Sequence, residues 1–182
     1  IGTETNPFKG VCDGENYKDS SLYSVQGIHT NKLMENHQGL FGCIKNSIIK
    51  GVSVDAGYVM GCNFLGGIAG NNFSSKIQNT RNTATIKGIS VIGGIAGKND
   101  DKDSQIINSA NEGLVIGDIA GGIIGSNFGE VKNSCNKAKI NGVNMLGGIS
   151  GHNDMARLIN VYNTGSITGT NNIGGIAGES YE

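Results

Sequence analysis

Proline occurs once in this chain of 182 residues, tryptophan is absent, and long hydrophobic runs are missing. The longest apolar stretches, such as IAGGIIG at 119–125, are far too short to cross a bilayer. The net charge is −1, and no basic run or aromatic–basic interleaving points to nucleic acid or an anionic membrane. With 37% apolar residues, the chain is too hydrophobic to be disordered. We therefore expect a folded protein with no nucleic-acid partner and no membrane insertion.

Motifs for common cofactors and catalytic centres are incomplete or absent. GGIAGKND at 93–100 departs from the P-loop, because Ile92 stands where the first glycine belongs and Asn99 where the hydroxyl residue belongs. None of the three histidines belongs to an HExxH pair, and no G-x-S-x-G elbow occurs. We expect neither a cofactor nor a catalytic site in this segment.

The beginning of the chain and its cysteines say little about the compartment. No charged-then-apolar leader is present, so any signal peptide lies outside these residues. The cysteines show neither CxxC spacing nor a nearby histidine pair, which argues against zinc. One or two disulfides and free thiols both remain open, and Cys43–Cys62 is the first pairing to test. The four cysteines are Cys12, Cys43, Cys62 and Cys135.

Glycine is abundant, with 31 residues, and much of it belongs to one recurring pentapeptide. GGIAG occurs three times, and GGIIG and GGISG are near copies. Their first glycines are 27, 28, 26 and 27 residues apart, and a weaker copy, GLFG at 39–42, lies one step earlier. A period of about 27 residues is too short for helical repeats or propeller blades and suits one coil of a parallel β-solenoid. The first glycines are Gly66, Gly93, Gly121, Gly147 and Gly174.

Local patterns support strands. Short alternating segments such as ATIKG and GSITG are typical of strands, and no segment carries a helical period. We predict an all-β protein, a parallel β-helix or β-solenoid of about six coils, with repeats over residues 39–182. Residues 1–38 break the period and are predicted to be an N-terminal cap or lead-in, because the terminal coil of an array otherwise exposes an unpaired edge.

Apolar and asparagine residues recur at fixed places in the repeats. An apolar residue precedes each glycine pair and an isoleucine follows it. Since strand alternation cannot bury both Ile92 and Ile95, a bend or bulge is implied at Gly93–Gly94. The glycines are expected to provide positive φ and close backbone approach at tight corners. The asparagines are expected to form side-chain ladders that satisfy turning backbone. Their columns are Asn72, Asn99, Asn127, Asn153; Asn79, Asn108, Asn133, Asn160; and Asn82, Asn111, Asn136, Asn163.

These residues resemble the GLUG repeat of bacterial surface proteins, whose core is glycine, an apolar residue, a variable residue and glycine. QGLFGCIKNSIIKGVSV at 38–54 is similar to the opening coil of such arrays, with Gly51 in place of the usual polar residue. The resemblance covers roughly residues 23–178. Such repeats are known from the non-catalytic part of streptococcal immunoglobulin A1 metallopeptidases and from clostridial adhesin-like proteins.

The resemblance implies an extracellular or cell-wall location in a bacterium. It implies a non-catalytic role as a stalk, as an adhesin-like binding surface or as the accessory region of a surface peptidase. The implied partners are a host or matrix protein or a glycan, and the remainder of a longer repeat array.

The corner between the first two asparagine columns changes in length and chemistry from coil to coil, so a binding surface is expected there. Its acidic loop could hold calcium, but the EF-hand glycine and terminal glutamate are missing, and a solvated acidic loop is the simpler interpretation. Phe73 and Phe128 occupy equivalent places two coils apart, where they either form an exposed aromatic contact or cover the core edge. The candidate calcium ligands are Asp100, Asp101 and Asp103. The candidate surface-binding residues are Phe73, Asp100, Asp101, Asp103, Phe128 and Asp154.

A polysaccharide-degrading β-helix enzyme is the alternative. A glycosidase pair would require two acids at equivalent positions of adjacent coils. The column that contains Asp118 holds one carboxylate among amides and a serine, and the repeats show no such pair. We therefore expect that this segment is not an enzyme; two acids converging in a groove would favour the alternative.

Overall fold

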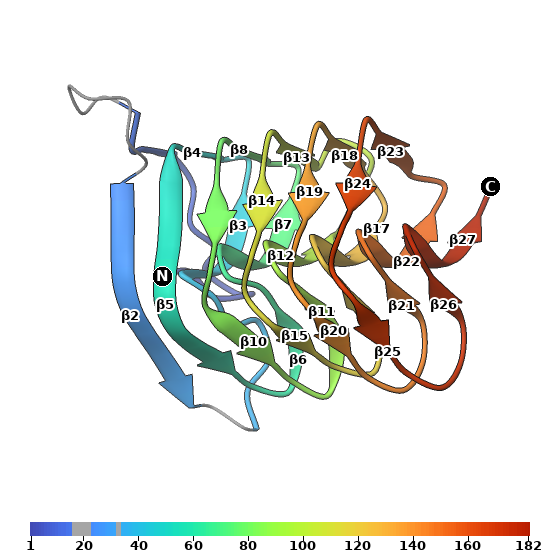
Figure 1. The fold of residues 1–182 in the computed structure, drawn as a ribbon. Coiled ribbons are helices and arrows are strands. Elements are labelled where there is room, and N and C mark those ends of the chain that lie inside the picture. Colours follow the sequence, from blue (N-terminus) through green and yellow to red (C-terminus); the bar gives the residue numbers. More distant parts are fainter. Residues whose placement is uncertain (16–22, 32–33) are drawn as a thin grey trace.

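The computed structural model describes residues 1–15, 23–31 and 34–182. The chain winds into a parallel β-solenoid of about six turns with a period of about 27 residues, which confirms the predicted architecture. The coils stack from β2 (Tyr23–Asn31) at one end to β27 (Ala177–Tyr181) at the other (Figure 1). The described part of the chain contains no helix, and hence none that could cross a membrane.

Each coil passes through four sheets, which we call A, B, C and D in chain order. Sheet A has six strands: β3 (Phe41–Lys45), β7 (Ala69–Phe73), β12 (Ala96–Asn99), β17 (Ile124–Asn127), β22 (Ser150–Asp154) and β27. Sheet B also has six: β1 (Val11–Asp13), β4 (Ile48–Lys50), β8 (Lys76–Gln78), β13 (Gln105–Ile107), β18 (Glu130–Lys132) and β23 (Arg157–Ile159).

In sheet C, the long β5 (Val52–Met60) of the first coil is replaced by two short strands in each later coil. The first of each pair is β9 (Arg81–Asn82), β14 (Ala110–Asn111), β19 (Cys135–Asn136) or β24 (Tyr162–Asn163). The second is β10 (Thr85–Lys87), β15 (Val115–Ile116), β20 (Ile140–Asn141) or β25 (Ile167–Thr168). Sheet D contains β6 (Asn63–Leu65), β11 (Ser90–Gly93), β16 (Ala120–Gly121), β21 (Leu146–Gly147) and β26 (Ile173–Gly174).

The described parts of residues 1–38 follow the same path as a coil. Phe8 bridges Ile44 beside sheet A, β1 pairs with β4, β2 pairs with β5, and Gln38 bridges Leu65 beside sheet D. Strand β2 therefore covers the edge of β5 that faces away from the repeats (Figure 1). Residues 16–22 and 32–33, which include part of the charged stretch CDGENYKD, lie outside the described residues. The domain boundary at residue 38 stays a prediction.

The two apolar columns beside each glycine pair form the core. Ile92 and Ile95 are both fully buried. Strand β11 ends at Gly93 and a bend precedes β12, so the bend predicted at Gly93–Gly94 is confirmed. The bend turns the chain from sheet D into sheet A, and this change of direction lets both isoleucines point inward. The equivalent buried residues of other coils are Leu65, Ile68, Ala120, Ile123, Leu146 and Ile149.

The glycine pairs provide close approach and not positive φ. No glycine of the five pentapeptides has a positive φ, so that part of the prediction was wrong. A Cβ on Gly93 would lie 1.9 Å from the carbonyl oxygen of Ala96, and one on Gly94 would lie 2.2 Å from Asn111 Cγ. Positive φ occurs instead at corner asparagines such as Asn79, with φ of 52°, because asparagine tolerates this region better than most residues. It also occurs two residues before glycine pairs, as at Val91 with φ of 59°.

Asparagine ladders run along the rod, as predicted. In the column on sheet C, Asn136 Oδ1 accepts a hydrogen bond from Asn111 Nδ2 at 2.9 Å and another from the Ala138 N–H at 3.2 Å. Its Nδ2 donates to the Ala138 carbonyl at 2.8 Å, so the ladder also satisfies the backbone where the chain turns. A second buried ladder joins Asn72, Asn99, Asn127 and Asn153, and a more exposed one joins Asn79, Asn108, Asn133 and Asn160.

Candidate binding face

One outward row of side chains on sheet A contains four of the six predicted surface-binding residues. In this sheet a buried asparagine is followed by a residue that points outward, because successive side chains of a strand alternate. Phe73, Asp100, Phe128 and Asp154 therefore lie on successive coils. We call this the front row; it comprises Lys45, Phe73, Asp100, Phe128, Asp154 and Tyr181.

A parallel row lies one step before the buried asparagines. Its residues point to the same side of the sheet, since they are two positions before the front row. We call it the second row; it comprises Cys43, Asn71, Lys98, Ser126, His152 and Glu179. The two rows together make up the outer face of sheet A.

Aromatic rings of the two rows contact one another toward the C-terminal end. The ring centroids of Phe128 and His152 are 6.1 Å apart, and those of His152 and Tyr181 are 5.7 Å apart. Such separations are those of interacting rings. The aromatic contact thus crosses three successive coils.

Lysines cover the rings of the two phenylalanines. Lys45 Nζ lies 4.4 Å from the centroid of the Phe73 ring, and Lys98 Nζ lies 5.1 Å from that of Phe128. Both distances fall within the range of cation–π contacts. Both phenylalanines are half-buried, and neither belongs to the side chains packed against the core. Their rings are therefore part of the surface.

Asp100 joins the two rows. It follows Phe73 and precedes Phe128 along the front row, and its Oδ1 pairs with Lys98 Nζ. Its Oδ2 accepts a hydrogen bond of 3.2 Å from Asn71 Nδ2. Asn71 Oδ1 is buried and has no hydrogen-bond partner within the described part of the chain. We call Asn71, Lys98 and Asp100 the coil-bridging triad.

Asp101 has a structural role at the corner between sheets A and B. Its Oδ1 accepts hydrogen bonds from the Ser74 N–H, the Ser104 hydroxyl and the Asp103 N–H at 3.2, 2.8 and 3.1 Å. Burial raises the pKa of Asp101, but the bonds from Ser74 and Ser104 outweigh it and leave the pKa below its ordinary value. The expectation that Asp101 is a freely solvated group was wrong.

The calcium hypothesis gains no support from this corner. The Asp100 carboxylate is occupied by Lys98 and Asn71, Asp101 binds the corner backbone, and Asp103 is exposed. Within residues 1–15, 23–31 and 34–182, no group of three acidic, histidine or cysteine side chains is placed to hold a metal ion.

A hollow of about 230 Å³ opens at the N-terminal end of the two rows. It brings Glu4 close to the front row, because the bridge between Phe8 and Ile44 carries the N-terminal segment along the edge of sheet A. Glu4 was not predicted from the sequence, since no periodic signal marks a residue outside the repeats. The polar and aromatic residues that line the hollow are Glu4, Lys45, Asn71, Phe73 and Asp100.

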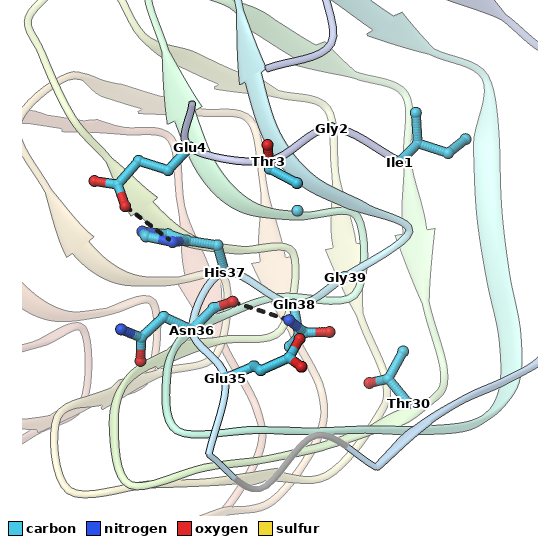
Figure 2. A pocket seen from close by; sticks show the side chains of 11 residues that line it. Ile1, Gly2, Thr3, Glu4, Thr30, Glu35, Asn36, His37, Gln38 and Gly39 are labelled. Carbon is cyan, nitrogen blue, oxygen red and sulfur yellow. Dashed lines mark hydrogen bonds and ion pairs between the residues drawn. The ribbon is translucent and has the colours of Figure 1, made fainter. Parts of the chain in front are cut away.

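A second hollow, of about 470 Å³, is also lined by Glu4 (Figure 2). Glu4 approaches His37 Nδ1 to 3.9 Å, and the His37 ring stacks on Phe64 with centroids 5.0 Å apart. Burial lowers the pKa of His37, although the Glu4 carboxylate acts in the opposite direction. Burial therefore favours the neutral form of His37 at this end of the rod.

The cysteines are unpaired in the structure, including Cys43 and Cys62. Cys43 is buried in the second row, and burial, with smaller effects of Glu4 and Asp100, raises the pKa of its thiol to about 11. A thiol with a raised pKa is a poor nucleophile.

Acids that converge in one groove would favour an enzyme. In the column of Asp118, its carboxylate accepts a hydrogen bond from Asn144 Nδ2 at 2.9 Å, so it belongs to a side-chain ladder. Glu4 and Asp100 line the same hollow, but they do not occupy equivalent positions of adjacent coils. They are the acids on which the alternative depends.

Comparison of the chain with protein-family models, with curated proteins and with solved structures finds no match. The resemblance to GLUG repeats therefore stays a prediction, and the function of this β-solenoid has to be inferred from the outer face of sheet A.

Proposed function

We propose that the chain is a non-catalytic rod of a secreted or cell-surface bacterial protein, and that the outer face of sheet A is its adhesin-like binding surface. The observation that carries the proposal is the continuous line of aromatic and charged side chains along this face. Aromatic residues provide large contact areas at little cost in conformational entropy. A host or matrix protein or a glycan is the expected partner.

Sheet C provides a contrast that favours sheet A. On and beside the first short strands of sheet C, four charged residues form ion pairs: Arg81 pairs with Asp55 at 3.1 Å and with Glu112, and Lys137 pairs with Glu112 at 3.0 Å. Exposed ion pairs of this kind contribute little binding energy. On sheet A the rings of Phe128, His152 and Tyr181 contact one another across three successive coils, and aromatic residues dominate binding hot spots.

The rod architecture supports a mechanical role beside the binding role. Each coil pairs with its neighbours, so the segment holds the binding face at a fixed distance from whatever lies beyond its ends. As part of a longer array, it would serve as a stalk at the cell wall or as the accessory region of a surface peptidase.

The test measures binding of the purified segment to immobilised host-type glycans and extracellular-matrix proteins. Phe73→Ala/Phe128→Ala should weaken binding about tenfold or more, since each aromatic contact contributes roughly 0.5–1.5 kcal/mol. Lys76→Ala/Lys132→Ala on sheet B is the matched control and should bind like the wild type. Retained binding in the aromatic variant, or equal loss in the control, would contradict the assignment to sheet A.

Glu4 and Asp100 in one hollow support the alternative, a polysaccharide-degrading enzyme. An enzyme would release new reducing ends or unsaturated products from polysaccharides, and Glu4→Gln would abolish the release. Binding without product formation would favour the non-catalytic role.

A further inference from the structure

The coil-bridging triad contains the three groups that a lysine–asparagine cross-link requires: an amine, a side-chain amide and a carboxyl group that contacts both. We propose that Lys98 Nζ and Asn71 Cγ become joined in an intramolecular isopeptide bond that covalently connects β12 to β7. Asp100 would transfer the protons. The proposal is independent of what the outer face of sheet A binds.

The register of the strands places the reacting residues together. Lys98 and Asn71 are directly opposite each other on adjacent parallel strands, and both belong to the second row. Neighbouring strands are about 4.8 Å apart, so the lysine side chain is long enough to reach the amide opposite it. The Asp100 carboxylate contacts Lys98 through one oxygen and Asn71 through the other. Holding the reacting groups in a productive orientation removes a large part of the activation barrier to such a reaction.

The surroundings of the triad limit its contact with water. The Lys98 and Asp100 side chains are 25% and 26% exposed, and the Lys98 amine lies over the Phe128 ring. Asn71 Oδ1 is buried and has no hydrogen-bond partner among the described residues, so the amide oxygen lacks the hydrogen bonds that water would provide. Its position is unexplained by the solenoid alone, because Asn71 belongs to none of the three asparagine ladders.

The chemistry is balanced and needs no oxidant or co-reactant. A proton passes from the Lys98 ammonium to the Asp100 carboxylate, and the neutral amine attacks Asn71 Cγ. A protonated Asp100 can donate a hydrogen bond to Asn71 Oδ1 once the side-chain amide has rotated so that Oδ1, in place of Nδ2, faces Asp100. The new Nζ–Cγ bond forms, the Cγ–Nδ2 bond breaks, and Nδ2 leaves as ammonia with the first proton, which Asp100 returns. The second proton that Nζ loses passes through Asp100 to water. One ammonia is released for each cross-link.

A second set of the same groups serves as an internal control. Glu15 contacts both Lys50 Nζ and Asn79 Nδ2. Here Lys50 also pairs with Asp13 at 2.9 Å, and the hydrogen bonds to the two carboxylates raise the pKa of its amine and keep it protonated. The amide of Asn79 is engaged in its own ladder, where its Oδ1 accepts from Asn108. We expect no bond between Lys50 and Asn79.

The first measurement is the intact mass of the folded, purified protein. It should be lower than the mass of the sequence by one ammonia. Trypsin should then yield residues 51–76 linked to residues 88–102, because a lysine bound in an amide is not cleaved. Fragmentation of the linked species should place the bond between Asn71 and Lys98.

Three variants separate the proposal from other losses of ammonia. Asp100→Ala retains both reacting groups and Lys98→Arg retains the positive charge, and both should show the full mass. Asp118→Ala removes a carboxylate that accepts a hydrogen bond from the Asn144 amide and has no lysine partner among the described residues, so this variant should show the same loss of mass as the wild type. A full mass in the folded wild type would overturn the proposal. So would a loss that maps to a succinimide at Asn141–Gly142, or to a Lys50–Asn79 link.

Discussion

The side-chain amide of Asn111 donates a 2.9 Å hydrogen bond to Oδ1 of Asn136, and both residues are fully buried between sheets. The equivalent bond recurs from Asn82 to Asn111 and from Asn136 to Asn163. Each coil thus offers its neighbour a buried polar group beside the apolar core. The ladder has two effects: the bonds between amides fix the register of the coils, and further bonds of the same amides satisfy the backbone where it turns.

Asn136→Ala should lower the free energy of unfolding by about 1–3 kcal/mol, because it leaves Asn111, Asn163 and backbone groups of Ala138 unsatisfied. Denaturant melts measure the loss. Lys102→Ala, at an exposed position, is the control and should stay within about 0.5 kcal/mol of the wild type. A neutral Asn136→Ala would remove the structural role assigned to the ladder.

Gly94→Val should be more destabilising than Asn136→Ala, because even its Cβ would lie 2.2 Å from Asn111 and from the carbonyl oxygen of Gly122. Gly175 is the equivalent glycine of the last coil, and a Cβ there meets nothing within 4 Å. Gly175→Val is therefore the matched control, and its melting curve should resemble that of the wild type. Equal effects at both positions would contradict the steric explanation.

Asp101→Ala should lower the free energy of unfolding by about 1–3 kcal/mol, since it removes the acceptor of the Ser74 hydroxyl and one of the two acceptors of the Ser74 N–H and of the Ser104 hydroxyl. Asp103→Ala in the same loop should change it by less than about 0.5 kcal/mol. The same melts, with and without chelator, test the calcium hypothesis: a large loss of stability in chelator would restore it.

His37 should make the stability depend on pH. Its pKa is lowered in the folded state, so the unfolded chain binds the proton more readily, and stability is lost as the pH falls below about 6.5. Melts of the wild type and of His37→Gln over this range measure the slope. The dependence of stability on pH should be weaker in His37→Gln, which retains His29 and His152. An unchanged dependence would contradict the role of His37.

Reductant should leave the melting temperature unchanged, because the four cysteines are unpaired in the structure. Cys43 should react slowly with alkylating reagents in the folded protein, since its thiol is buried and its pKa is raised to about 11. Melts with and without reductant test the first prediction, and peptide mapping after brief alkylation measures the labelling of Cys43. Labelling of Cys43 as fast as in the unfolded chain would contradict its burial.

The sequence by itself determined the architecture, because the residues that recur in each repeat are those whose side chains contact the equivalent residues of the next coil. A period of about 27 residues specifies coil length, the isoleucine columns specify the core, and the asparagine columns specify the ladders. It also pointed to Phe73, Asp100, Phe128 and Asp154, since these follow the buried asparagines. Within the repeat, the positive φ expected at the glycine pairs was wrong, because the sequence alone does not distinguish a glycine needed for close approach to a neighbouring coil from one needed for positive φ.

The tertiary structure decided how the non-repeating residues are used. Glu4 reaches sheet A because the N-terminal segment pairs along its edge, and no periodicity encodes that pairing. Asp100 and Asp101 are neighbours with the same chemistry, yet one bridges Lys98 and Asn71 and the other binds a corner backbone. Strand alternation and the turn after β12 direct them to different partners on the preceding coil. These contacts depend on the stacking of coils, which a single repeat cannot reveal.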